Sequence, residues 1–305
     1  MPTQLQGIIP PIVTPFDEAG RIDEATFRNV IRFTIGKGVH GICVGGSTGE
    51  GHTYTTEEFV RLMEIAAEEA SGRTPLLAGI ITNSTKNAVD RAKAIAHLNV
   101  AALQITPVHY LFKPDDVATF RHFEAITAEI NTPVVIYNVV PWNYLSPALL
   151  VHIMEKLPGV IGVKQSAGDL KLMADLLLTA PKGKLIFTAV DALLYSSFAL
   201  GAHGTIAANP AAVPGVCVAL WDAVQRGDHK TGLQIHEALL RFWNTIVGDN
   251  LPANVKYALS RQGCPAGLPR MPMPVSSAER HRSIDIALKE VLTFDPTLAN
   301  KARVA

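Results

Sequence analysis

Residues 134–166 read VVIYNVVPWNYLSPALLVHIMEKLPGVIGVKQS, and this stretch contains the unit from which the chain is built. Its ends, 134–137 and 161–164, are short runs of β-branched and other apolar residues, which is typical of buried β-strands. Between them, Ser146 and Pro147 form a typical helix start, with serine as the N-cap and proline at the first helical position. The stretch therefore predicts a strand, a helix and a second strand.

The same alternation runs through the chain. A helix is predicted from about Asp23, with Phe27, Val30, Ile31 and Ile35 on one face. Another is predicted after Thr55 and Glu58, which have the spacing of a capping box. In chain order, the predicted strands are 7–13, 41–44, 76–80, 102–105, 134–137, 161–164, 185–188 and 204–207.

Eight strands alternating with eight helical segments over about 230 residues come close to the ~250 residues typical of a (β/α)8 TIM barrel. A doubly wound sheet is the alternative, but no GxGxxG fingerprint follows any strand. Residues from about 229 to 294 read as further helices, interrupted by a Gly- and Pro-rich segment at 263–269. The sequence therefore predicts a (β/α)8 barrel over 1–228 and, over 229–305, a C-terminal helical extension of the same domain.

The composition excludes several classes of protein. Of the 305 residues, 48% are hydrophobic and 18% charged, which is normal for a globular protein with a substantial core. Lysine plus arginine equals aspartate plus glutamate at 27 each, so no long-range field favours nucleic acid or an anionic membrane. The three cysteines have no metal-ligand or CxxC spacing, which favours reduced thiols. Residues 1–6 lack a charged leader, and no run approaches the ~18 apolar residues of a membrane span. We expect a soluble, cytoplasmic protein without nucleic-acid or membrane partners.

Lys164 is the only charged residue in the strand at 160–166. Burial disfavours the protonated form of an amine, so a lysine in an apolar strand can act as a nucleophile that forms a Schiff base with a carbonyl compound. The alternative is a lysine at a strand end whose amine reaches water. The strand at 134–137 ends in Tyr137, so two neighbouring strands would place a phenol beside an amine. Since barrel enzymes carry their sites at the carboxyl ends of the strands, both residues are candidates.

The loop after the second strand reads GGSTGE at 45–50. Its glycines allow close approach, and its backbone N–H groups, with the hydroxyls of Ser47 and Thr48, are suited to bind a carboxylate. A tight glycine turn without ligand is the alternative. The stretch also matches GxSxG, but a nucleophile elbow needs a helix directly after the serine, and the capping box begins only at Thr55. This argues against a serine hydrolase.

Together, GGSTGE, the strand ending in Tyr-Asn and the strand carrying Gly-Val-Lys resemble the dihydrodipicolinate synthase and N-acetylneuraminate lyase family of Schiff-base aldolases, in order and spacing. The resemblance runs from Ile12 to the helical tail. It implies that Lys164 forms an imine with C2 of pyruvate or another 2-oxo acid, that Tyr137 relays protons, and that Ser47 and Thr48 bind the carboxylate.

Further positions follow from the same resemblance. Tyr110 matches a second tyrosine of the hydroxyl relay, with His109 as the rival position and interface packing as the alternative role. Asp191 matches a position where the lyase binds a polyhydroxyl tail, although a helix N-cap is the alternative. Gly46 and Ile206, beside the ends of the second and eighth strands, complete the predicted substrate site.

The chain also departs from the family. Synthases carry an arginine two residues after the proline that follows Tyr-Asn, whereas this chain has Trp142 or Asn143 there. This argues against lysine biosynthesis, and both residues are predicted to face the substrate, where Trp142 favours a more apolar end. The lyase has an acidic residue after the matched aspartate, whereas this chain has Ala192. A long polyol acceptor is therefore disfavoured.

The sequence thus predicts a class I Schiff-base lyase, an aldolase or dehydratase acting on pyruvate or a pyruvate-derived 2-oxo acid with an unidentified aldehyde partner. Three alternatives stay open: 4-hydroxy-tetrahydrodipicolinate synthase, a 2-keto-3-deoxy-sugar-acid aldolase or dehydratase, and a non-catalytic 2-oxo-acid sensor. No cofactor is expected. No metal is expected either, because His236-Glu237 begins an HExxH pattern but Leu240 occupies the second histidine position. The resemblance also implies a homo-oligomer, a tetramer or a dimer.

Overall fold

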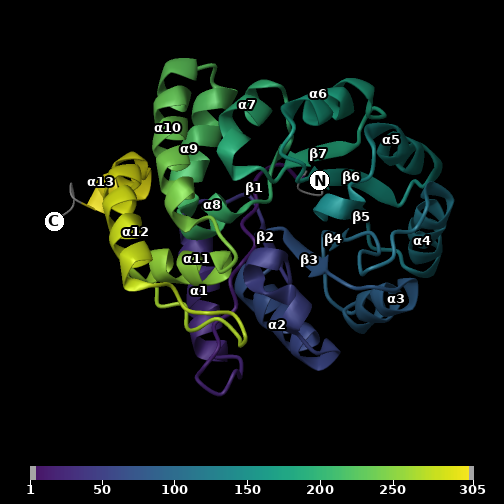
Figure 1. The fold of residues 1–305 in the computed structure, drawn as a ribbon, viewed down its shortest axis with the longest axis horizontal. Helices are drawn as coiled ribbons and strands as arrows, with labels where there is room; N and C mark the ends of the chain where they lie inside the picture. The colour runs from purple at the N-terminus through teal and green to yellow at the C-terminus, as the bar shows by residue number, and fades with distance from the viewer. Residues whose placement is uncertain (1–4, 302–305) are drawn as a thin grey trace.

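The computed structural model describes residues 5–301, and its strands form one curled parallel sheet with the helices outside it (Figure 1). The sheet has eight strands in the order β1-β8-β7-β6-β5-β4-β3-β2. The strands are β1 (Gly7–Ile8), β2 (Ile42–Val44), β3 (Leu76–Ile80), β4 (Ala102–Ile105), β5 (Val134–Asn138), β6 (Val160–Gln165), β7 (Leu185–Thr188) and β8 (Gly204–Thr205). The predicted (β/α)8 barrel is confirmed.

The barrel closes through a segment that is not itself a strand. We predicted a first strand over 7–13, but β1 ends at Ile8. Pro10 and Pro11 have no backbone N–H and cannot continue a ladder. The segment still meets β2, because Cys43 N donates to Pro10 O (2.9 Å) and Ile12 N donates to Cys43 O (2.8 Å). These two bonds, with a third from His40 N to Ile8 O (2.8 Å), join this edge of the barrel to β2.

Helices follow the strands in the expected alternation, with one difference. The helices are α1 (Glu24–Gly36), α2 (Thr56–Ala70), α3 (Thr85–Ala94), α4 (Asp116–Glu129), α5 (Pro147–Lys156), α6 (Leu170–Thr179), α7 (Leu194–Ala199), α8 (Ala208–Ala212) and α9 (Pro214–Gln225). The segment after β8 is divided into α8 and α9, where we predicted one helix. Pro214 explains the division, since proline starts a helix well and continues one badly.

The predicted helix starts are confirmed. Thr55 accepts a hydrogen bond from Glu58 N (3.2 Å), and Thr55 N donates to Glu58 Oε2 (3.0 Å), which is the reciprocal pair of a capping box. Ser146 Oγ accepts from Leu149 N at the start of α5. The apolar face of α1 is buried at Phe27, Val30 and Ile31.

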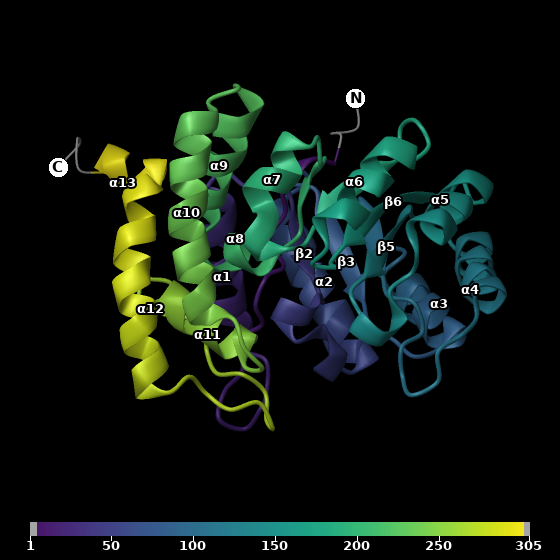
Figure 2. The same cartoon turned by 45° about the horizontal axis from the view of Figure 1, so that its top comes forward.

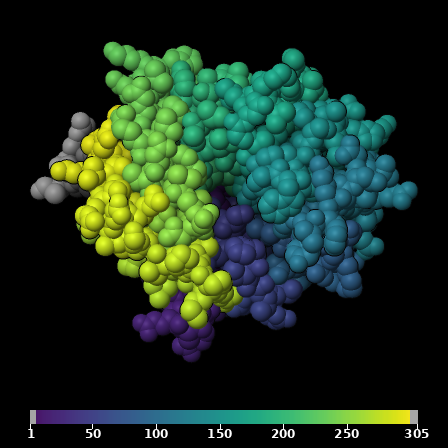
Figure 3. Space-filling model, in the orientation of Figure 1, coloured from purple at the N-terminus to yellow at the C-terminus, as the bar shows by residue number. Residues whose placement is uncertain are grey.

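Four helices form the C-terminal part: α10 (His229–Ile246), α11 (Leu251–Ser260), α12 (Ala278–Val291) and α13 (Pro296–Lys301). Helices α9, α10 and α12 lie side by side on one flank of the molecule (Figure 2). The space-filling view shows the yellow C-terminal segments on this flank, on the side opposite the teal segments of the barrel (Figure 3). Within the described part of the chain, no helix has the length and hydropathy to cross a bilayer.

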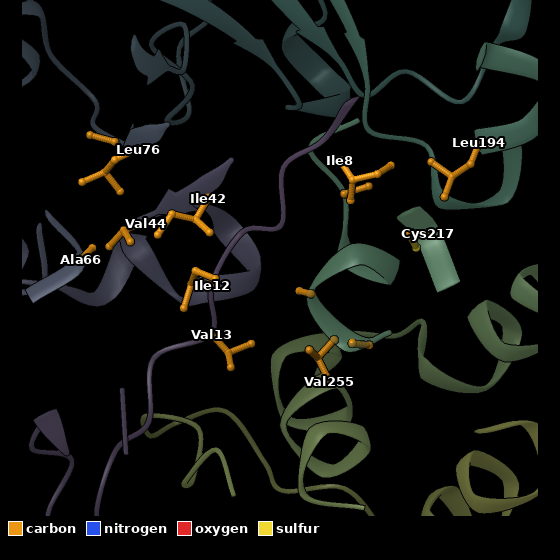
Figure 4. Close-up of a cluster of buried hydrophobic side chains, with 14 of the residues drawn as sticks. Ile8, Ile12, Val13, Ile42, Val44, Ala66, Leu76, Leu194, Cys217 and Val255 are labelled. Atoms are coloured by element: carbon orange, nitrogen blue, oxygen red, sulfur yellow. The ribbon is translucent and has the colours of Figure 1, made fainter. Parts of the chain in front are cut away.

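One hydrophobic core joins the barrel to the C-terminal helices. Ile12 and Val13, which follow β1, lie near Val255 of α11 (Figure 4), and all three belong to the same buried cluster. A smaller cluster fills the barrel interior and includes Cys43, Phe187 and Ile206. The domain boundary at residue 228 stays a prediction, and so does the absence of a leader, because residues 1–4 lie outside the described part.

A buried ion pair connects the GGSTGE loop to the C-terminal helices. Lys256 of α11 and Glu50 are 2% and 0% exposed in their side chains, and Lys256 Nζ lies 2.6 Å from Glu50 Oε1. Lys256 also donates to Leu268 O (2.7 Å), and Arg270 N donates to Glu50 Oε2 (2.8 Å). Burial lowers the pKa of Lys256. Glu50 holds a left-handed backbone conformation (φ 65°), which is uncommon for a residue with a side chain. We infer that these bonds hold it in that conformation.

We expect Lys256→Met to destabilise the protein by about 3–5 kcal/mol, since removal of one partner leaves the other charge buried. The measurement is urea unfolding at neutral pH. The control is Lys171→Met, which breaks an exposed pair with Asp175 and should cost less than about 1 kcal/mol. Equal stability of the two variants would contradict the assignment.

Candidate active site

The structure brings Lys164 and Tyr137 together, as the sequence pattern predicts. They are directly opposite each other in the register of β5 and β6. Both are buried, with 3% of each residue exposed. Lys164 Nζ lies 3.7 Å from the centroid of the Tyr137 ring. A lysine amine and a phenol thus meet at the carboxyl ends of neighbouring strands, where barrel enzymes carry their sites.

Ser47 lies on the other side of the phenol. Ser47 Oγ and Tyr137 Oη share a hydrogen bond of 3.0 Å. Ser47 begins the 3₁₀ turn η1 (Ser47–Gly49), for which Gly46 is the N-cap residue. Thr48, the next residue, is buried. The GGSTGE loop therefore approaches the phenol that stands beside Lys164.

Glycines let this loop approach the barrel wall. Gly45 has a left-handed backbone (φ 84°), a conformation that favours glycine. A Cβ at Gly79 of β3 would lie 2.6 Å from the carbonyl carbon of Gly45. Residues with side chains at these two positions would displace the loop that carries Ser47.

Asn138 and Gln165 follow the two central residues and face away from them. Asn138 Nδ2 donates to Gln165 Oε1 (3.2 Å), which joins the ends of β5 and β6. Asn138 also bonds both backbone groups of Leu145, since Leu145 N donates to its Oδ1 (2.9 Å) and its Nδ2 donates to Leu145 O (3.2 Å). The amide pair thus fixes the β5–α5 loop and the relative position of the two strand ends.

Asp191 lies in a buried position near the predicted site and caps a helix other than its own. It begins the 3₁₀ turn η4 (Asp191–Leu193). Its Oδ1 accepts from Asn209 N (2.5 Å) and its Oδ2 accepts from Ala208 N (3.1 Å), so it satisfies the first turn of α8. Burial raises the pKa of Asp191 to about 6, against these hydrogen bonds and the charge of Lys164. A capping role was the alternative to polyol binding, and its substrate role stays a prediction.

Tyr110, Trp142 and Asn143 lie in two neighbouring loops. Trp142 Nε1 donates to His109 O (3.1 Å) and to Tyr110 O (3.2 Å). Asn143 is buried, and its Nδ2 donates to Val108 O (2.7 Å). The hydrogen-bond donors of both side chains therefore hold the β4–α4 loop. We predicted that these residues face the substrate, and that role stays a prediction.

The remaining predicted residues have simpler surroundings. Tyr110 is 69% exposed. Ile206 is fully buried inside the barrel. Among residues 5–301, no three histidine, cysteine, aspartate or glutamate side chains are placed to hold a metal ion.

Sequence reasoning missed several residues of this region. Glu50 and Lys256 were not recognised, although Lys256 is the only charged residue of α11, the same signal that identified Lys164. Tyr144 was also missed. Its Oη donates to Ser166 O (3.3 Å), two residues after Lys164. Burial raises the pKa of Tyr144, and the proximity of Tyr137 raises it further.

Comparisons with known proteins show the family of this chain. Residues 4–291 match the model of the dihydrodipicolinate synthetase family. The 4-hydroxy-tetrahydrodipicolinate synthase of Leptothrix cholodnii is 32% identical over 286 residues, which cover 93% of this chain and 97% of that protein. The synthase of Bradyrhizobium diazoefficiens is 32% identical over 91% of this chain and 94% of its own length.

Solved structures agree with this result. Dihydrodipicolinate synthase from Bacillus anthracis superposes with a TM-score of 0.88 at 27% identity, covering 94% of this chain and 98% of that one. CdNal from Clostridium difficile, solved in complex with mannosamine, has a TM-score of 0.88 at 27% identity, covering 95% of this chain and all of that one.

The chain belongs to the dihydrodipicolinate synthetase family. It is a class I lyase, a Schiff-base aldolase by family, as the sequence predicted.

We expect the stability of the protein to fall, relative to Asp191→Asn, as the pH rises through about 6. The pKa of Asp191 is raised to about 6 in the folded state, so the folded protein keeps this proton to higher pH than the unfolded chain does. Between the two pKa values the unfolded chain binds fewer protons, and stability decreases with pH. The full change is roughly 3 kcal/mol between pH 3 and pH 7.

Thermal unfolding of both proteins between pH 5 and pH 7 tests this. The control is Asp228→Asn. Hydrogen bonds from Thr231 lower the pKa of Asp228, so the difference in stability between this variant and the native protein should not change with pH in that range. If the difference for Asp191→Asn does not change with pH either, the carboxyl of Asp191 is already ionised at pH 5.

Proposed function

We propose that the chain forms an imine between Lys164 and C2 of pyruvate or a pyruvate-derived 2-oxo acid, and makes or breaks a bond at C3 or C4. The single observation that carries this proposal is the row of three groups at the barrel mouth. Lys164 Nζ lies 3.7 Å from the Tyr137 ring centroid, and the Tyr137 hydroxyl is 3.0 Å from that of Ser47.

The chemistry follows from these positions. The amine attacks C2, and the resulting carbinolamine loses water to give a protonated imine. The imine withdraws electrons from C3, so a C3 proton is lost or a C3–C4 bond breaks, with an enamine as product. Each of these steps moves a proton. The Tyr137 ring stands beside the amine, and its hydroxyl shares a hydrogen bond with Ser47, so this phenol is suited to act as acid and base in turn.

The GGSTGE loop is the proposed carboxylate site. Net charge is zero, so an anion must be held locally. The Ser47 hydroxyl and the backbone around Gly46 and Thr48 supply donors at the barrel mouth. The buried Glu50–Lys256 pair fixes the far end of the loop.

A second candidate is 4-hydroxy-tetrahydrodipicolinate synthase, the name carried by the curated relatives at 29–32% identity. Against it stands the β5–α5 loop, where residues 139–145 contain no arginine or lysine to bind a second carboxylate. Condensation of pyruvate with aspartate semialdehyde decides between the two. Turnover comparable to that of an authentic synthase would establish the second candidate.

Two further functions would use part of the same site. A 2-keto-3-deoxy-sugar-acid aldolase or dehydratase uses the same imine and differs only in the group beyond C3. A 2-oxo-acid sensor would need Lys164 but no proton relay, so the placement of Tyr137 beside the amine favours an enzyme. The aldehyde partner is unidentified, and assays with a panel of aldehydes would identify it.

An exposed apolar cluster supports the proposal of a homo-oligomer, a tetramer or a dimer. Tyr110, Leu111, Phe112 and Trp142 are 69%, 73%, 78% and 63% exposed. They lie in two loops joined by hydrogen bonds. A patch of this kind marks an interaction site, and a second copy is the occupant we propose. It would bring a partner subunit's Tyr110 toward the site.

The cytoplasmic location also stays a proposal, supported by three buried, free cysteines.

Borohydride reduction in the presence of pyruvate should attach the reduced ligand to the peptide that contains Lys164, as measured by mass spectrometry. The control is Lys184→Gln, which removes another amine whose pKa burial lowers. Lys184 bonds Val160 O at the start of β6, at the other end of the strand from Lys164, so this variant should still be labelled at Lys164. Lys164→Gln should take no label. Labelling elsewhere, or none in the native protein, would refute the proposed function.

Phe112→Glu should shift the protein from oligomer to smaller species, because a charge at the patch cannot be buried against a second copy without a partner. Sedimentation velocity measures the change. The control is Leu178→Glu, an equally exposed position on α6, which should leave the assembly intact. A native protein that sediments as a monomer would contradict the proposal.

A further inference from the structure

We infer that Tyr144 is a specificity-determining residue that contacts a hydroxyl group on the fourth carbon of the substrate. The inference rests on the proposed imine at Lys164 and concerns the part of the site that the family resemblance leaves open. Tyr144 follows the 3₁₀ turn η3 (Pro141–Asn143) in the β5–α5 loop.

The phenol of Tyr144 spans the ends of the two strands that carry the site. Its Oη donates to Ser166 O (3.3 Å), which lies two residues after Lys164. Ser166 N donates in turn to Asn138 O (3.1 Å), the residue after Tyr137. Asn138 bonds both backbone groups of Leu145, the residue after Tyr144. Tyr144 is therefore held on both sides, directly beyond the amine and the first phenol.

Tyr144 is partly enclosed by the protein and partly exposed. Burial raises the pKa of its hydroxyl, and Tyr137 is the neighbouring group that raises it further. Ser166 Oγ is buried and has no hydrogen-bond partner among the described residues. The Tyr144 hydroxyl, which the imine chemistry does not use, thus stands near Tyr137 of the reacting pair.

The order of the strands decides which part of a substrate reaches Tyr144. The carboxylate loop follows β2, and β2 lies four strands from β6 in the eight-stranded order, on the opposite side of the barrel. A 2-oxo acid with C1 at Ser47 and C2 at Lys164 extends from β2 toward β6. Its third and fourth carbons then lie on the side of Tyr144.

The side chains of the β5–α5 loop around Tyr144 define the ligand class. Residues 139–145 carry no charged side chain, so this part of the loop does not suit a second carboxylate. A tyrosine offers one hydroxyl and an aromatic face. This combination fits a short, uncharged chain with a hydroxyl on C4, that is, a 4-hydroxy-2-oxo acid, the product of pyruvate and a small aldehyde.

The test measures binding through imine trapping and needs no knowledge of the natural aldehyde. Borohydride labelling of Lys164 is titrated with 4-hydroxy-2-oxobutanoate and with 2-oxobutanoate, which lacks only the hydroxyl. The native protein should half-saturate at a lower concentration of the hydroxylated acid. In Tyr144→Phe this preference should fall about fivefold to tenfold, the effect of losing one hydrogen bond, while labelling by pyruvate is retained.

The matched control is Tyr195→Phe. Tyr195 lies on α7, and its hydroxyl contacts His229 Nδ1 (3.2 Å) rather than the site, so its loss should leave the preference unchanged. Equal half-saturation by both acids in the native protein overturns the inference, whatever the variants do. So does an unchanged preference in Tyr144→Phe. Failure of pyruvate to label native Lys164 refutes the proposed function instead, and loss of that labelling only in Tyr144→Phe assigns Tyr144 to imine formation and overturns its role in specificity.

Discussion

The buried ion pair between Glu50 and Lys256 is the interaction on which the arrangement of the site depends. It joins the GGSTGE loop after β2 to α11, 206 positions later in the chain. Neither charge reaches water, so each is stable only while the other is in place. Since Glu50 directly follows the η1 turn that carries Ser47, the packing of the C-terminal helices and the position of the proposed carboxylate site are coupled. The helical extension is therefore part of the scaffold of the proposed site.

Much of the fold was predictable because its signals are local. The strand runs, the capping box at Thr55 and the Ser146-Pro147 start are read within a few residues. Apart from the first strand, which ends at Ile8 instead of residue 13, they have the predicted structure. The pair of Lys164 and Tyr137 was predictable because parallel strands bring their ends together. Lys256 shows the limit: a single lysine in an apolar segment is the same sequence signal as Lys164, but its partner is distant in the chain. Local pattern shows that a buried amine needs an explanation, and only the tertiary structure shows which explanation applies.

The β5–α5 loop shows how a departure from the family pattern changes the site. Where the synthases have an arginine, Trp142 and Asn143 donate their hydrogen bonds to carbonyl groups of the β4–α4 loop. The two loops are thereby joined, and residues 139–145 offer no cation to a second carboxylate. One position further, Tyr144 turns toward the end of β6. Under the proposed function, this loop therefore suits an uncharged chain better than a second carboxylate.

The closure of the barrel has a consequence for biosynthesis. β1 pairs in the sheet with β8, where Gly7 faces Gly204. It is joined to β2 by the bonds around Pro10 and Pro11 and by His40 N, which donates to Ile8 O. During synthesis β1 emerges well before its main partner strand, β8, which follows nearly two hundred residues later. Ile8 can bond His40, 32 positions further on, but its pairing with Thr205 must wait for β8, and contacts so distant in sequence form late. The two prolines limit what this waiting segment can do: without their N–H groups it is a poor template for pairing with strands of other chains.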